Sequence, residues 1–174
     1  MLVSILDPLP LEIIICDGGS TDDTPGIVRQ WLRTTAVPVK LIELHGRQSR
    51  ASTQNTGLRA AVGTYVVFVH IDTVPPPDMV SIIQDTLRDY RVGLGAFRAV
   101  ITDGRTINHF ITFHHGIKTF YAPFLLYPRR FLFHGLRSFL GDQCIFGRRV
   151  QLLQVDGFDD TPIMEESSLC HKMI

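Results

Sequence analysis

The sequence is poor in cysteine, carries no net charge and contains no long apolar run. Its three cysteines, Cys16, Cys144 and Cys170, lie far apart and form no CxxC pair, which excludes a disulfide scaffold and a structural zinc site. Lysine and arginine together number 17, as do aspartate and glutamate, and this balance disfavours a nucleic-acid binder with a broad basic face. Because neither a basic leader nor an apolar run of roughly 18 residues is present, we expect a cytoplasmic protein without a spanning helix.

Two common phosphate-binding fingerprints are also absent. The sequence has neither a GxGxxG turn nor a GxxxxGK[ST] loop, which disfavours NAD-dependent dehydrogenases and P-loop enzymes. What is present is a chain of 174 residues, 45% of them apolar, which is enough to build one domain over residues 1–174 around a buried core.

Strand-like and helix-like segments alternate along the first half of the chain. Short apolar, β-branched runs predict strands, and apolar residues at the helical period predict helices between them. This alternation is typical of an α/β fold with parallel strands and crossover helices. The predicted strands cover 11–17, 39–44, 65–71, 92–101 and 142–148, and the predicted helices cover 24–34, 50–62, 78–90, 106–121, 150–155 and the segment from 164.

Two of the predicted strands end in an aspartate. Asp17 precedes two glycines, and Asp72 stands two residues after His70. Because the carboxyl ends of parallel strands meet at one edge of a sheet, we expect both carboxylates to face one crevice. Carboxylate oxygens suit Mg²⁺ or Mn²⁺, which predicts a cation at Asp72 and a nucleotide at Asp17. Alternatively, each aspartate only caps a turn or the next helix.

Six segments resemble, in order, the motifs of one enzyme family. They read IICDGGSTDDT at 14–24, RASTQNTG at 50–57, GTYVVFVHIDT at 63–73, GDQCIF at 141–146, DGFD at 156–159 and MEE at 164–166. Together they resemble glycosyltransferase family 2, and in particular a bacterial subgroup whose metal motif often reads HAD. The resemblance implies the GT-A fold, a mostly parallel sheet flanked by helices, with a nucleotide-sugar half at 1–105 and an acceptor-side half at 106–174.

The resemblance also implies a reaction. The family transfers a sugar, with inversion, from a nucleotide-diphosphate donor to an acceptor hydroxyl, and a divalent cation (Mn²⁺ or Mg²⁺) bridges the diphosphate. One carboxylate opposite the leaving group serves as the base. The implied residues are Asp17, Gly19, Arg50 and Asn55 for the nucleotide, Asp72 and His70 for the metal, Glu166 or the competing Glu165 as the base, and Asp142 and Gln143 on the acceptor side.

Three departures from the family pattern stand out. Glu166 replaces an aspartate, and His70 replaces an acid, so that His70 is alternatively only a hydrogen-bonded residue at a strand end. The family's first strand and helix have no counterpart before residue 11, although that strand lies between those matching 11–17 and 65–71. A parallel neighbour needs a crossover of about a dozen residues, which residues 1–10 do not supply. We therefore expect either a piece of a longer protein or a slot filled from elsewhere.

Two rival functions and one ambiguous region remain. The first rival is a truncated or non-catalytic relative, and the second is a nucleotidyltransferase, although the basic glycine-rich loop of that class is absent near the N-terminus. Phenylalanines crowd residues 110–139, among several arginines. This region is either an acceptor-side wall or membrane-surface patch, with peripheral membrane contact through 120–140, or ordinary core from two packed helices.

Overall fold

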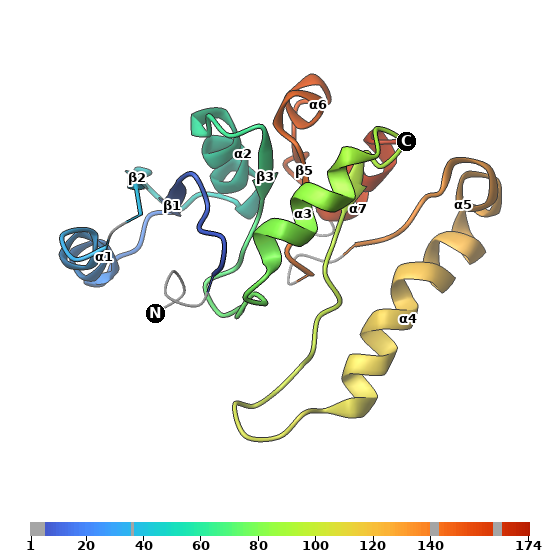
Figure 1. Ribbon diagram of the computed structural model, residues 1–174, viewed down its shortest axis with the longest axis horizontal. Helices are drawn as coiled ribbons and strands as arrows, with labels where there is room; N and C mark the ends of the chain where they lie inside the picture. The colour runs from blue at the N-terminus through green and yellow to red at the C-terminus, as the bar shows by residue number, and fades with distance from the viewer. Residues whose placement is uncertain (1–5, 36, 140–142, 162–164) are drawn as a thin grey trace.

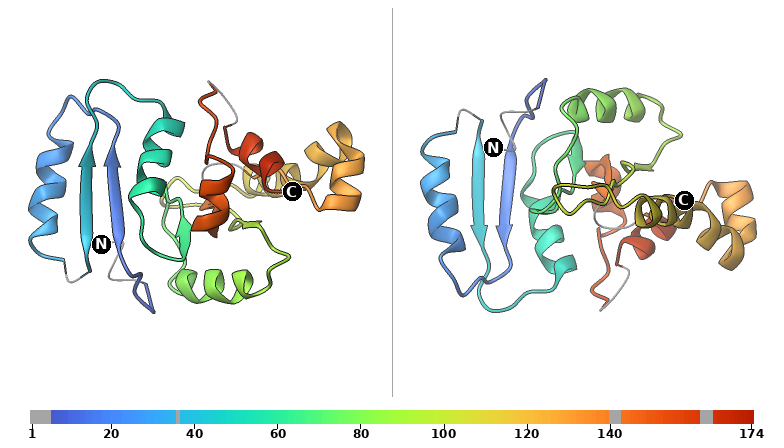
Figure 2. Two further views of the ribbon diagram at one scale, coloured as in Figure 1. Left: turned by 90° about the horizontal axis from the view of Figure 1, so that it is seen from above. Right: turned by 90° about the horizontal axis from the view of Figure 1, so that it is seen from below.

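The strands form two separate sheets in the computed structural model, which describes residues 6–35, 37–139, 143–161 and 165–174 (Figures 1 and 2). The first sheet pairs β1 (Ile13–Asp17) with β2 (Val39–Glu43) in parallel, and α1 (Thr24–Leu32) forms the crossover. The helix begins at Thr24, as predicted, and Asp23 is its N-cap. This unit confirms the predicted strand–helix–strand arrangement.

The second sheet differs from the prediction in direction and strand length. It has the order β3 (Tyr65–Val67), β5 (Phe146–Arg148) and β4 (Leu94–Gly95), and β5 is antiparallel to both neighbours. The strands predicted at 65–71 and 92–101 are therefore much shorter. Apolar periodicity predicts which segments are extended. The length of a strand, however, depends on how far a neighbouring strand forms hydrogen bonds with it, and tertiary packing determines that neighbour. The mostly parallel sheet is thus confirmed only for the first pair.

Helices cover both faces of the second sheet. On one face α2 (Arg50–Ala60), α6 (Arg149–Gln154) and α7 (Glu165–Lys172) pack around Ile145, while α3 (Met79–Arg88) packs against Phe146 on the other. Successive residues along an extended segment point to opposite faces, so these two neighbours enter separate clusters. The clusters contain Ala51, Leu58, Ile145, Leu152, Phe158 and Leu169 on one face, and Leu6, Met79, Ile83, Leu87 and Phe146 on the other.

A gap separates the two sheets. In the part of the chain that the structure describes, β1 pairs only with β2, and β3 pairs only with β5. A cavity of about 480 Å³ lies between them, lined by β1, β3, α2 and α3. This is the position at which the sequence predicts that a strand is missing.

A helical arm extends from the body of the molecule (Figure 1). It consists of α4 (His109–Leu126) and α5 (Pro128–His134), and α4 runs five residues beyond the predicted end at residue 121, with Pro123 in its last turn. Among the described residues no helix is both long enough and apolar enough to cross a membrane.

Arg148 ties β5 to the end of α3. Its guanidinium is buried and donates hydrogen bonds to the main-chain carbonyls of Leu87, Val92 (2.7 Å) and Asp89 (3.0 Å). It also stacks over the Tyr90 ring at 4.7 Å. Nothing in the sequence distinguishes this arginine from the exposed ones.

Replacing Arg148 by methionine is expected to lower the free energy of unfolding by roughly 2–4 kcal/mol, because three buried or partly buried carbonyls lose a charged donor at once. Urea titration of both proteins measures the difference. Arg91→Met is the matched control, since that side chain is 91% exposed and forms an ion pair with Asp89. Its cost should stay below about 1 kcal/mol. A similar cost for both variants would contradict the structural role of Arg148.

Candidate active site

The guanidinium of Arg50 brings three predicted site residues together. Its Nε lies 3.1 Å from Glu165 Oε1, and its Nη2 lies 2.5 Å from Glu166 Oε1. The same Nη2 is 3.2 Å from His70 Nε2. The start of α2, the segment after β3 and the start of α7 therefore converge, although Arg50 and Glu166 are 116 residues apart in the chain.

Helix ends hold this cluster in place. Ser49 caps α2, since its Oγ accepts a hydrogen bond of 3.1 Å from the amide of Ser52, and Arg50 is the first residue of the helix. Glu165 and Glu166 occupy the first turn of α7, where the helix dipole favours negative charge. Both glutamates are 5% exposed, whereas the Arg50 side chain is 57% exposed. Two buried carboxylates therefore contact one arginine whose side chain is itself exposed to solvent.

Asp17 organises the loop that follows β1. Its carboxylate accepts hydrogen bonds from the amides of Gly19 (3.3 Å) and Ser20 (3.0 Å) and from the Ser20 hydroxyl. The Ser20 hydroxyl and amide hold the pKa of Asp17 below its usual value. The loop lies beside the start of α2, because the Gln48 amide donates to the Gly18 carbonyl at 2.9 Å. The Asp17 side chain therefore shapes its own turn, as the alternative interpretation predicts.

Gly19 is required by the geometry of this loop. Its φ of +95° is unfavourable for other residues, and a Cβ there would lie 2.1 Å from the Gly46 carbonyl oxygen. The predicted role of Gly19 in nucleotide binding stays a prediction, and the loop has the close backbone approach that such a role needs.

Asp72 is exposed and has no hydrogen-bond partner among the described residues. It lies within a turn in which the Thr73 amide donates to the His70 carbonyl at 3.0 Å. An unengaged carboxylate fits Mn²⁺ or Mg²⁺, which often take one or two protein ligands and complete their shell with phosphate and water. His70 Nε2 contacts the Arg50 guanidinium, so a cation would have to bind the other ring nitrogen, Nδ1, and the predicted role of His70 as a ligand stays a prediction. The described residues contain no cluster of three or more potential metal ligands.

The side-chain amide of Asn55 forms hydrogen bonds with the backbone of a distant loop. Its Nδ2 donates to the Phe158 carbonyl at 2.7 Å, and its Oδ1 accepts from the Phe158 amide at 2.9 Å. A Cβ at Gly157, whose φ is +61°, would meet Asn55 Oδ1 at 2.2 Å. Both polar groups of the amide are therefore engaged in positioning this loop, and the predicted place of Asn55 near the nucleotide stays a prediction.

The acceptor-side prediction is only partly described. Gln143 is buried, and its side-chain Nε2 lies 3.3 Å from Thr119 Oγ1 of α4. Its main-chain carbonyl accepts a hydrogen bond of 2.7 Å from the Phe97 amide. It therefore anchors the arm to the sheet. Asp142 lies outside the described residues.

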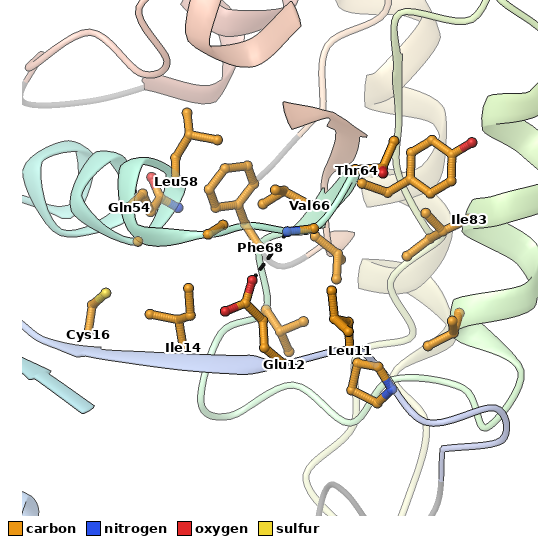
Figure 3. A pocket seen from close by; sticks show the side chains of 18 of the residues that line it. Leu11, Glu12, Ile14, Cys16, Gln54, Leu58, Thr64, Val66, Phe68 and Ile83 are labelled. Atoms are coloured by element: carbon orange, nitrogen blue, oxygen red, sulfur yellow. Dashed lines mark hydrogen bonds between the residues drawn. The ribbon is translucent and has the colours of Figure 1, made fainter. Parts of the chain in front are cut away.

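The cavity between β1 and β3 is lined mainly by apolar side chains (Figure 3). Cys16 and His70 lie on its wall, next to the segments that contain Asp17 and Asp72. Glu12 crosses it, since its carboxylate accepts from the amides of Val62 (2.7 Å) and Gly63 (3.3 Å). Sequence reasoning missed Glu12, and the only signal was an acid at the start of an apolar strand.

The α/β arrangement, in which Arg50 at the start of α2 meets Glu165 and Glu166 at the start of α7, matches solved structures with the GT-A fold. The pattern of Glycosyl transferase family 2 matches residues 2–154, and the chain belongs to this family. Curated protein sequences gave no match.

Solved structures of glycosyltransferases share the fold. A mannosyltransferase of Pyrobaculum calidifontis, solved with GDP-Man and Mn²⁺, has a TM-score of 0.68 at 23% identity, with 95% of this chain and 44% of that chain covered. TarS of S. aureus, residues 1–349 with UDP, gives 0.65 at 19% identity, with 97% and 47% covered. The chain thus spans less than half the length of these relatives.

Proposed function

We propose that this chain transfers a sugar, with inversion, from a nucleotide-diphosphate donor to an acceptor hydroxyl, assisted by a divalent cation. The observation that carries the proposal is the cluster in which Arg50 contacts Glu165, Glu166 and His70. The neighbours solved with GDP-Man and Mn²⁺ and with UDP support a nucleotide-sugar donor. The cytoplasmic location expected from the sequence stays a prediction.

The residues of the proposed site have distinct tasks. Arg50 supplies positive charge near the donor and fixes Glu166 by a charge-assisted hydrogen bond of 2.5 Å. Glu166, held at the start of α7, takes the proton of the acceptor hydroxyl as the anomeric carbon is attacked. Asp72 would hold Mn²⁺ or Mg²⁺, and the cation supplies neutralisation of charge on the departing diphosphate. Asp17 and Gly19 shape the loop beside which the nucleotide would lie.

Calorimetric titration tests the donor site directly. The chain is titrated with GDP, UDP and the corresponding monophosphates, each with and without Mn²⁺. We expect a nucleoside diphosphate to bind in the presence of Mn²⁺ and to bind at least about tenfold more weakly without it. Absence of binding by every nucleotide would overturn the proposal. Release of pyrophosphate during turnover would instead assign the chain to the nucleotidyltransferases.

One observation favours a second candidate, a non-catalytic relative. The cavity between β1 and β3 leaves the facing edges of both strands without a partner strand among the described residues. Unpaired sheet edges amid apolar side chains are costly, and they loosen the end of the sheet that holds Asp17. A chain that binds a nucleoside diphosphate with Mn²⁺ yet neither hydrolyses nor transfers from any nucleotide sugar would support this candidate.

A further inference from the structure

The helix α4 is apolar on the face that a globular helix normally exposes to water. Its buried residues are Thr112, Thr119 and Pro123, which lie on one side of the helix. Phe110, by contrast, is 79% exposed. Phe113, Ile117, Phe120 and Phe124 continue the exposed side at steps of three and four residues. The prediction that this region is ordinary core is therefore wrong for these side chains.

The exposed apolar surface continues onto α5. Phe133 is 77% exposed, and Leu132 of the same helix and Leu126 at the end of α4 are also exposed. The two helices pack through Phe124 and Phe131, whose ring centroids lie 5.5 Å apart in an edge-to-face arrangement. A contiguous exposed surface of this kind marks a contact site with a protein or a membrane. We call the exposed side chains of α4 and α5 the apolar face.

The charge of the arm distinguishes between a protein and a membrane as the partner of the apolar face. Residues 104–141 contain five of the 17 lysines and arginines and none of the 17 acidic residues, so the rest of the chain carries a net charge of minus five. Lys118, Arg129, Arg130 and Arg137 form no ion pair within the described residues. Arg137 instead lies over the rings of Phe131 (4.3 Å) and Phe120 (5.4 Å). The cations of the arm are thus left without protein carboxylates.

We infer that the apolar face of α4 and α5 docks on the surface of an anionic lipid bilayer. Aromatic side chains enter the boundary between head groups and acyl chains, while the flanking arginines meet lipid phosphates. The helix lies in the plane of the surface, since no described helix is suited to span the bilayer. A partner helix fits less well, because the three-four spacing extends over about two heptads, fewer than the three to four of a coiled coil.

Vesicle sedimentation of the whole chain tests this inference. Partitioning is measured onto phosphatidylcholine vesicles and onto vesicles that also contain phosphatidylglycerol, at low and at high salt. We expect binding to the anionic vesicles, little binding to phosphatidylcholine alone, and weaker binding as salt rises. No binding to anionic vesicles, or equal binding to both compositions, would overturn the inference.

Two sets of variants separate the apolar and the ionic contributions. Each of two double variants should lower the partition coefficient at least about tenfold. The first combines Phe110→Ser with Phe133→Ser, and the second combines Arg105→Glu with Arg129→Glu. All four side chains are exposed, so the fold should be retained. Two control variants make the same changes at exposed positions elsewhere and should leave partitioning unchanged. One combines Ile27→Ser with Val150→Ser, and the other combines Arg33→Glu with Arg59→Glu.

Light scattering without lipid tests whether a second copy of the chain, rather than a lipid surface, covers the apolar face. If the wild-type chain is a dimer that the phenylalanine variant separates, the apolar face binds a second copy and the inference is overturned. A wild-type monomer whose binding is lost in both arm variants supports the lipid surface.

Discussion

Replacing Glu166 by glutamine is expected to lower the rate of sugar transfer by about 100- to 10,000-fold, the usual contribution of a positioned general base. The amide keeps the size of the side chain and its place at the start of α7, but it cannot take a proton from the acceptor. Binding of the nucleoside diphosphate should change little. Steady-state transfer rates with a nucleotide sugar, together with calorimetric titration of the diphosphate, measure both quantities.

Glu165→Gln is the matched control for this prediction. Both glutamates are buried to the same extent and contact the same guanidinium, but only Glu166 shares Nη2 of Arg50 with His70. We therefore expect the Glu165 variant to lose much less activity, on the order of tenfold or below, through a shift of Arg50. A larger loss in the Glu165 variant than in the Glu166 variant would move the role of the base to Glu165.

Replacing Asp72 by asparagine is expected to remove both the activity and its metal dependence. An exposed carboxylate without a partner among the described residues contributes little to stability, so the fold should be unaffected. Loss of a cation ligand removes several kcal/mol of charge stabilisation from the departing diphosphate, which corresponds to a fall in rate of about 100- to 1,000-fold. The measurement is a titration of transfer rate, and of diphosphate affinity, against Mn²⁺ concentration.

Asp85→Asn provides the comparison for Asp72. That aspartate is also exposed, but it belongs to α3 and pairs with Arg88 at 2.7 Å, away from the Arg50 cluster. Its variant should keep the wild-type rate and the wild-type response to Mn²⁺. If Asp72→Asn retains a normal metal response, the cation is held by other groups, and the assignment of Asp72 fails.

The structure brings some of the predicted site residues together and engages others elsewhere, and the reason differs for each. Arg50, His70, Glu165 and Glu166 are found together, because each follows a strand or begins a helix whose type the sequence predicts well. Asn55 has the residue type expected at a nucleotide, but its amide is taken up by the backbone of Phe158, a partner 103 residues away. No local pattern reveals such a partner, nor the one that Arg148 finds at the end of α3.

The sequence by itself determined the elements and the family motifs: α1, β2, α2 and α3 lie within a few residues of where apolar periodicity predicts them. Propensity, capping and turn formation act over a few neighbouring residues, which is why these features can be read locally. Only the tertiary structure decided that β5 runs antiparallel between β3 and β4, that β1 stands apart across a cavity, and that the phenylalanines of α4 face outward. Each of these depends on which distant segment covers an apolar face, and helical spacing is the same whether that face is turned inward or toward a partner.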